Sequence, residues 1–232
     1  MRKSLSFTFL IIIGVVLFSI ASCGGSSERQ LADTDSEDAR EYAQVEEELY
    51  DTHEEEEVVN NFKTFPIYTD ARSPDNHYIA SGYMGDSADV SVEMASFEEP
   101  HSGTTCIKTV YANAISQGAR WSGVYWQNPA NNWGEREGGF DLTGASKLTF
   151  WVRGEKGGER IEEFKMGGLA GLYPDSDIAG IGPVLLTSEW KQYEIDLRGK
   201  DLSYISGGFA WATNIDVNPD GVTFYLDDIR YE

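Results

Sequence analysis

The stretch Lys147–Gly154, KLTFWVRG, shows the alternation that decides the fold class. In an extended strand, successive side chains point to opposite faces of the sheet. The even-numbered residues of this stretch are apolar up to position 152, whereas the odd-numbered ones include Trp151 and Arg153. The apolar face is expected to fill a core between two sheets, because stacked sheets bury the facing side chains of their strands. The stretch therefore predicts one strand of a two-layer β structure.

Similar short runs recur throughout the chain from Phe62 onward. They are rich in β-branched and aromatic residues and are separated by Gly, Pro, Asn and Asp, which are typical of turns. The runs span residues 65–70, 89–96, 105–112, 121–128, 147–154, 160–168, 182–188, 191–198, 207–214 and 222–232. No stretch of ten or more residues has clean helical periodicity. Many strands without crossover helices predict an all-β domain and favour an antiparallel β-sandwich over a barrel.

The N-terminus has the pattern of a secretory signal. Arg2 and Lys3 precede an apolar stretch from residue 7 to residue 20, and small residues follow it, directly before Cys23. A cysteine at this place resembles a bacterial lipobox. The resemblance implies that residues 1–22 are a signal peptide and that Cys23 carries lipid, which anchors the protein to a membrane. The alternative is an uncleaved membrane anchor, but no basic stop-transfer cluster follows the apolar stretch.

Residues 23–60 are predicted to be a disordered acidic linker. Residues 24–60 contain 14 acidic residues and two arginines, a net charge of -12. Such a segment buries too little apolar surface to offset the loss of conformational entropy on folding. A short helix around EDAREYAQVEEELY is an alternative. Together these patterns divide the chain into a signal peptide at 1–22, a lipidated linker at 23–60 and a β-sandwich at 61–232.

The charge and the cysteine count exclude two further features. The formal net charge of the chain is -21, and nucleic acid is not expected as a partner, because phosphate binding needs a basic surface. Cys106 is the only cysteine besides Cys23, so a lipidated chain has no intrachain disulfide. Cys106 lies in a strand-like run and is expected to be a buried small hydrophobe.

Three segments carry a resemblance to a known family. DLTGASKLTFWVRGE (141–155), SEWKQYEIDL (188–197) and FYLDDIRYE (224–232) resemble the galactose-binding-like β-sandwich, a jelly roll that many extracellular carbohydrate-binding modules share. The resemblance extends from about Phe65 to Glu232. It implies the fold but does not specify the function, because the same sandwich serves glycan binding, protein binding and structural roles.

No catalytic motif is present. The three histidines, His53, His77 and His101, form no metal or nucleophile pattern, and the sequence contains neither HExxH nor GxSxG. Adjacent acids such as Glu162-Glu163 point to opposite faces of a strand, which separates them. We therefore expect a protein that is not an enzyme. The remaining catalytic alternative is a glycoside hydrolase or lyase whose two carboxylates are distant in sequence.

Aromatic residues beside amides give the strongest functional signal. Sugars bind through their C–H faces on flat aromatic rings, while planar polar groups hold their hydroxyls. Alternation places Trp121, Gly123 and Tyr125 on one face, and Val124 and Trp126 on the other. The predicted carbohydrate-binding residues are Trp121, Tyr125, Gln127, Asn131, Asn132, Trp133, Trp151 and Arg153. Trp133 is expected to be exposed in a polar loop, and Tyr83 to contribute from another loop. The bulky residues Trp190, Phe209, Trp211 and Phe224 are expected in the core.

Calcium is the second predicted ligand. Relatives in the galactose-binding-like group often hold a structural calcium between the first and last strands, and acidic loops supply the oxygens that it needs. The resemblance therefore suggests a site formed by Asp70, Asp75, Asn76, Asp227 and Asp228. A second acidic loop contains Asp175 and Asp177. The alternative for all of these residues is a metal-free turn, because Asp and Asn favour turns by themselves.

The sequence thus predicts a lipoprotein of the bacterial cell envelope, in the outer membrane by analogy with known sorting rules, that binds carbohydrate without catalysis. The alternative is a protein-interaction or structural envelope lipoprotein with no sugar ligand. A flat exposed aromatic patch without a binding cleft would favour that alternative.

Overall fold

The computed structural model describes residues 61–232, which form thirteen strands and one short 3-10 helix, η1 (Ser87–Asp89). The strands are β1 (Phe65–Tyr68), β2 (Ile79–Gly85), β3 (Val90–Ser96), β4 (Cys106–Tyr111), β5 (Trp121–Gln127), β6 (Lys147–Gly154), β7 (Arg160–Ile161), β8 (Glu163–Gly167), β9 (Ile178–Ile181), β10 (Val184–Leu185), β11 (Lys191–Asp196), β12 (Gly207–Asn214) and β13 (Val222–Tyr231). Each of the ten predicted runs contains at least one of these strands.

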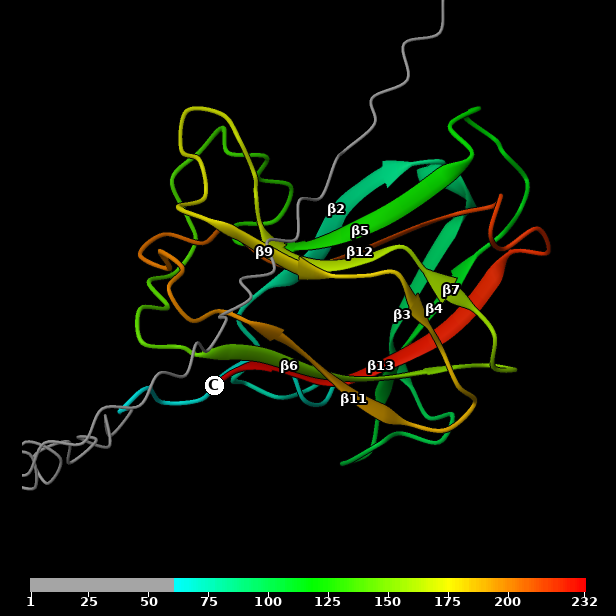
Figure 1. Cartoon of the computed structure of the whole chain (residues 1–232), viewed down its shortest axis with the longest axis horizontal. Helices are drawn as coiled ribbons and strands as arrows, with labels where there is room; N and C mark the ends of the chain where they lie inside the picture. The colour runs from blue at the N-terminus through cyan, green and yellow to red at the C-terminus, as the bar shows by residue number, and fades with distance from the viewer. Residues whose placement is uncertain (1–60) are drawn as a thin grey trace, which may run out of the picture. The chain divides into compact units, whose positions relative to one another are not determined.

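Two antiparallel sheets stack on each other (Figure 1). Sheet A has the order β11-β6-β13-β4-β3, with β1 also paired to β13, and sheet B has the order β2-β5-β12-β8-β9. Strands β7 and β10 form a small separate pair. The predicted antiparallel β-sandwich is therefore confirmed. Among residues 61–232, no helix is long and apolar enough to cross a membrane. The predictions for residues 1–22, Cys23 and the linker lie outside the described residues.

Strands β2 and β9 were not predicted from the sequence. Both contain glycine, which weakens the β signal because it is rare in strand interiors. The expectation that Tyr83 lies in a loop was wrong, because Tyr83 belongs to β2 and pairs with Val124 of β5. Cross-strand pairing with β5 thus stabilises a segment whose own composition does not favour a strand.

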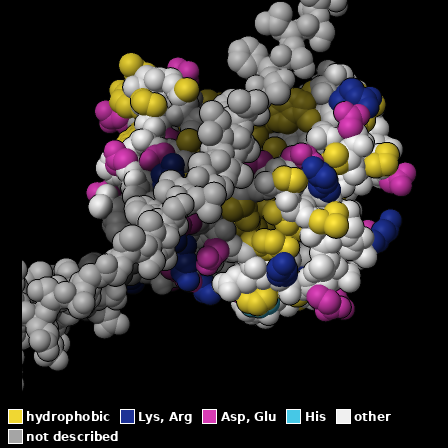
Figure 2. All heavy atoms as spheres, viewed as in Figure 1, with side chains coloured by type: hydrophobic (Ala, Val, Ile, Leu, Met, Phe, Trp, Pro, Cys, Tyr) yellow, Lys and Arg dark blue, Asp and Glu magenta, His cyan; other side chains and the backbone are white. Residues whose placement is uncertain are grey.

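The core fills the space between the two sheets. The apolar face of β6 points into it as predicted, and the predicted core residues Phe209, Trp211 and Phe224 are fully buried. Seen from the edge where β9 and β11 lie, hydrophobic side chains gather at the level between the layers (Figure 2). The prediction for Trp190 was wrong. Trp190 is half-buried just before β11, and its indole N–H donates to the carbonyl of Glu99 at 2.8 Å.

Cys106 is fully buried at the start of β4, as predicted. Burial raises the pKa of its thiol to about 11. The thiolate is the reactive form of cysteine, so this residue is a packing residue rather than a nucleophile.

Candidate functional site

Strand β5 lies between β2 and β12 in sheet B, and its outward side chains form part of the outer face of that sheet. Alternation separated two sets of residues without assigning either to the core. Val124 and Trp126 belong to the core, so Trp121, Gly123 and Tyr125 point outward. The neighbouring strands β2 and β12 extend this outer face on either side. The residues that share the outer face of sheet B therefore follow from the pairing of its strands.

Small residues form much of this surface. Two cross-strand rows show the pattern: one runs Met84, Gly123, Ala212, Glu163, and the other runs Gly82, Tyr125, Ala210, Lys165, Gly180. Glycine and alanine keep the surface low, because they carry little or no side chain. Neighbouring side chains cover part of this surface: Gly82, Gly123 and Ala210 are buried, whereas Ala212 and Lys165 are partly exposed. We call these two rows the sheet B floor.

Tyr125 is a support within this floor rather than an exposed ring. It is only 4% exposed, packs against Leu169 and Ala210, and donates its hydroxyl to the carbonyl of Gly167 at 3.0 Å. Burial raises the pKa of its phenol. The edge of Trp133 meets this ring at a centroid distance of 6.0 Å. Tyr125, predicted to bind carbohydrate, thus holds Trp133 in place from beneath.

Two tryptophans stand exposed at opposite ends of β5. Trp121 begins the strand and is 41% exposed, and Trp133 follows its end and is 38% exposed, as the polar loop predicted. The Trp133 ring packs against Tyr125, which lies four residues along the strand from Trp121, and four steps of extended chain span about 13 Å. The outer face therefore offers two exposed aromatic rings.

Gln127 and Asn132, both predicted to bind carbohydrate, are buried and hold the loop after β5. The Gln127 side-chain amide donates to the carbonyl of Asn132 at 2.9 Å and accepts from the hydroxyl of Ser81 at 3.0 Å. The side-chain amide oxygen of Asn132 accepts from the backbone N–H groups of Gly134 and Arg136. Both amides are therefore used within the protein and position Trp133 rather than meet a ligand.

Asn131 is the exposed amide of this loop. Its backbone N–H donates to the hydroxyl of Ser81 at 2.9 Å, and its φ of 55° lies in the left-handed region that asparagine tolerates better than most residues. No hydrogen bond of its side chain occurs within the described residues. Of the three predicted amides, Asn131 alone retains donor and acceptor groups for a ligand.

A second loop supports the first. The backbone N–H of Tyr173 donates to the carbonyl of Gly134 at 2.8 Å, which joins loop 168–177 to loop 128–139. Gly134 has a φ of 86°, and a Cβ there would lie 1.8 Å from the carbonyl oxygen of Ala170. Only glycine fits this contact. The buried carboxylate of Asp175 accepts from the N–H groups of Leu169 and Gly207, which ties the second loop to β12.

Lys165 and Glu163 add charged groups that the sequence reasoning missed. They lie on the outer face of β8, 3.1 Å apart, and the ammonium of Lys165 is 5.4 Å from the centre of the Tyr125 ring. The alternation of apolar Phe164 and Met166, both in the core, with these two residues was the signal that could have found them. The pair gives the floor one donor group and one acceptor group.

Trp151 and Arg153, also predicted to bind carbohydrate, lie on the outer face of sheet A. The structure does not bring them together with Trp121. Trp151 stacks under His101, with ring centres 3.7 Å apart, and the guanidinium of Arg153 lies 3.8 Å from the centre of the Tyr225 ring. The segment 97–105 covers this face. A continuous platform that joins all of the predicted residues therefore does not form.

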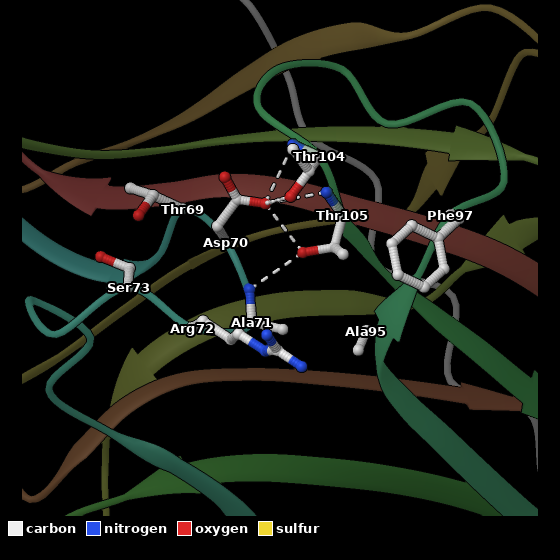
Figure 3. Close-up of a pocket in the computed structure, with 9 residues that line it drawn as sticks. All are labelled: Thr69, Asp70, Ala71, Arg72, Ser73, Ala95, Phe97, Thr104 and Thr105. Carbon is white, nitrogen blue, oxygen red and sulfur yellow. Dashed lines mark hydrogen bonds between the residues drawn. The ribbon is translucent and has the colours of Figure 1, made fainter.

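The predicted calcium ligands are occupied by groups of the protein itself. One oxygen of Asp70 accepts four hydrogen bonds from Thr104 and Thr105 (Figure 3). The side chain of Asn76 bonds backbone atoms of its own loop, as in a metal-free turn. Asp75 is exposed at the tip of that loop.

The acids of the last strand are occupied as well. Asp227 accepts backbone N–H groups of His101 and Ser102, and Asp228 lies 2.8 Å from His101 Nδ1. The other acidic loop is similar, since Asp177 accepts from Lys200 and two N–H groups. Within residues 61–232, no group of three or more His, Cys, Asp or Glu could hold a metal ion. These residues do not fit a calcium ion in this arrangement, and calcium binding stays a prediction.

Comparison with known proteins relates the fold to carbohydrate-binding modules. No protein-family model and no curated protein sequence matches the chain. A crystal structure of a family 30 carbohydrate-binding module is similar, with 15% identity and a TM-score of 0.51, over 74% of this chain and 88% of the module. The family 30 module of a cellulosomal cellulase of Clostridium thermocellum is 14% identical, with a TM-score of 0.50, over 73% of this chain and 97% of the module. At these identities the similarity shows a shared β-sandwich fold.

Proposed function

We propose that this chain is a non-catalytic carbohydrate-binding lipoprotein of the bacterial cell envelope. The lipid on Cys23 would anchor it, in the outer membrane, and the acidic linker would hold the sandwich away from the lipid surface. The outer face of sheet B would bind a glycan chain. The fold shared with family 30 carbohydrate-binding modules supports this reading, since such a module binds carbohydrate by definition.

One observation carries the proposal: Trp121 and Trp133 are exposed on the outer face of sheet B, where many of the paired residues are small. An exposed ring can stack on the C–H face of a sugar, because that face is apolar while the hydroxyls point outward from its rim. The partly exposed floor residues Ala212 and Glu163 would contact the sugars that link two stacked units. Lys165, Glu163 and Asn131 would bond their hydroxyls.

The outer face supports binding better than hydrolysis. Among the positions of the two described rows, Glu163 is the only carboxylate, and it is paired with Lys165 at 3.1 Å. Glycoside hydrolysis normally uses two carboxyl groups on either side of the bond. Asp175, the buried acid nearby, accepts backbone N–H groups and serves the loop. Stacking and hydrogen bonding are therefore the chemistry that this surface offers.

Retention on insoluble polysaccharides tests the proposal. The full chain in detergent is passed over cellulose, chitin, xylan and mannan, with Trp121→Ala, Trp133→Ala and the matched control Leu185→Ala, whose side chain is 65% exposed on β10. We expect wild type and control to be retained on at least one polymer and both tryptophan variants to elute early. Retention that neither tryptophan variant weakens would refute the assignment of the site.

The same assay with calcium and with chelator tests the calcium prediction. Retention that is lost with chelator would place a metal in the site or in its scaffold. Absence of retention on every polymer would favour the alternative function, binding of a protein partner. Leu172 and Ile178, which are 75% and 47% exposed beside this face, are the observation that supports this alternative.

A further inference from the structure

A hollow of about 670 Å³ opens at a break in sheet A. Strand β4 pairs with Val222–Leu226 of β13, and β1 pairs with the same strand from Ile229 to Tyr231, so the two follow each other along one side of β13. The hollow lies where β1 ends and β4 begins. Its lining residues are Thr69, Asp70, Ala71, Arg72, Ser73, Ala95, Phe97, Thr104 and Thr105.

This hollow is separate from the sheet B floor. All of its lining residues lie on or next to β1, β3 and β4, which are strands of sheet A. None of them belongs to the two rows of small residues or to the loops that hold Trp133. A ligand bound here would therefore contact a different set of residues from a glycan on sheet B.

Asp70 presents a fixed acceptor to this hollow. Its Oδ1 accepts the N–H and hydroxyl groups of Thr104 and Thr105 at 2.8 to 3.0 Å, which lowers the pKa of the carboxyl and keeps it ionised. Its Oδ2 has no hydrogen-bond partner within residues 61–232. This oxygen lies close to Gly103, where the Cβ of any other residue would come within 2.2 Å of it. The oxygen is thus held in one place and free to accept.

Arg72 and Phe97 supply a donor and an apolar ring. Within the described part of the chain, Arg72 takes part in no ion pair and its guanidinium makes no hydrogen bond. Phe97 is 77% exposed, an unusual state for a phenylalanine on a folded domain. In Figure 3, the Phe97 ring stands on one side of the hollow, with Asp70 and Ser73 on the other.

The charges favour an uncharged ligand. The lining residues include one carboxylate, Asp70, and one guanidinium, Arg72, so their formal charges cancel. The chain as a whole carries a formal charge of -21, which disfavours the approach of anions. Hydroxyl groups of Thr69, Ser73 and Thr104 complete the lining. The chemistry that matches is a neutral molecule with several hydroxyls and one apolar face.

We propose that this hollow is a second carbohydrate-binding site, which takes a neutral mono- or disaccharide unit. The Phe97 ring stacks on the C–H face of the sugar, Asp70 Oδ2 accepts from its hydroxyls, and Arg72 donates to its oxygens. The volume lies in the range of small-molecule sites, about 300 to 1,000 Å³. The proposal does not rest on the sheet B floor, because the two sites share no residue.

Saturation-transfer NMR on the full chain in detergent tests this site. The probes are the methyl glycosides of glucose, galactose, mannose and N-acetylglucosamine, each too short to span the two tryptophans of sheet B. The variants are Phe97→Ala and Arg72→Gln, both at exposed positions, with Trp121→Ala, Trp133→Ala and Leu185→Ala as comparisons. Thermal unfolding followed by circular dichroism checks that every variant folds.

We expect at least one glycoside to bind wild type, and each of Phe97→Ala and Arg72→Gln to weaken it by about tenfold. The three comparison variants should leave that binding unchanged. No binding of any probe to wild type, or binding that the Phe97 and Arg72 variants leave intact, would overturn the proposal. Failure of the sheet B proposal is read separately, because it appears only in polysaccharide retention by the Trp121 and Trp133 variants.

Discussion

The two outer faces of the sandwich are built by the same alternation but are used differently. On sheet A, the outward residues of β6 and β13 are large and are covered by the segment 97–105, with His101 stacked on Trp151 and Arg153 on Tyr225. On sheet B, the outward residues are mostly glycine and alanine, and Trp121 and Trp133 stand free at the ends.

The difference shows that an aromatic or cationic residue on an outer face need not be a binding residue. Arg153 is 7% exposed because its guanidinium donates to the carbonyl of Glu98 and lies on a tyrosine ring. A side chain whose hydrogen bonds and ring contacts are made within the protein stabilises the packing of segment 97–105 on sheet A. On sheet B, Trp121, Trp133 and Asn131 remain exposed, so there the same residue types are available to a ligand. Changes on sheet A should therefore alter stability, and changes on sheet B should alter binding.

The largest effect is expected from Arg153→Ala on sheet A. The change removes a charged hydrogen bond and leaves the carbonyl of Glu98 and the ring of Tyr225 without their partner. We expect the free energy of unfolding to fall by about 2 to 4 kcal/mol, measured by urea denaturation. Retention on polysaccharide should persist at temperatures where the variant is folded. Lost binding by a folded, stable variant would place a sugar on sheet A and break the comparison.

Trp121→Ala and Trp133→Ala should show the opposite pattern. Each removes an exposed ring, so we expect affinity for the retaining polysaccharide to fall about tenfold per ring. The free energy of unfolding should fall by only about 1 kcal/mol, because Trp121 is 41% and Trp133 38% exposed. Affinity electrophoresis measures the first quantity and urea denaturation the second. A large loss of stability without loss of binding would contradict the assignment of both rings.

Ala212→Leu tests whether the ligand crosses the sheet B floor. Ala212 lies on the outer face between Gly123 and Glu163, and a leucine there would raise the surface without entering the core. We expect a several-fold loss of glycan affinity with stability nearly unchanged, as is usual for surface positions. Thr223→Leu, at a half-buried position of β13, is the control. Equal affinity of Ala212→Leu and wild type would show that the ligand does not cross the floor.

A separate prediction concerns the pH dependence of the covered face. Burial raises the pKa of Asp227 from 3.8 to about 6, close to Asp228 and beneath His101 and Ser102. A carboxyl with a raised folded-state pKa stabilises the fold below its unfolded pKa, and that contribution is lost as the pH rises through about 6. Wild type should therefore lose stability relative to Asp227→Asn between about pH 4 and about pH 7.

Urea denaturation of both proteins across this pH range provides the measurement. Subtraction of the two curves removes the contribution of the other acids, provided that they are unaffected by the substitution. A difference in the free energy of unfolding that stays constant with pH would show that Asp227 does not titrate in this range. It would also show that segment 97–105 packs on sheet A with Asp227 charged.

Alternation was enough to predict the β-sandwich and the orientation of its strands. The period of two in β6 correctly placed its apolar residues in the core, and in β5 it separated Val124 and Trp126 from Trp121 and Tyr125. The exposure of Trp133 also followed from its polar, glycine-rich surroundings. These predictions succeeded because side-chain direction in a strand and loop polarity are local properties.

Local properties could not assign the residues to a site. Gln127 and Asn132 have the chemistry of a sugar site, but their hydrogen bonds to Ser81, to each other and to the loop backbone were invisible in sequence. Trp151 likewise has the right ring but lies on the other sheet. The strand order, which joins β5 to β12 and separates it from β6, is set by contacts between residues far apart in the chain.

The amino-acid sequence by itself therefore determined the fold class, the facing of each strand and the kind of residue available for binding. Packing between distant segments determined which outer face is covered, which amides are satisfied and where a polar hollow opens beside Asp70. The physical reason is the range of the interactions: side-chain alternation repeats every two residues, whereas the covering of a sheet depends on loops that return from tens of residues away.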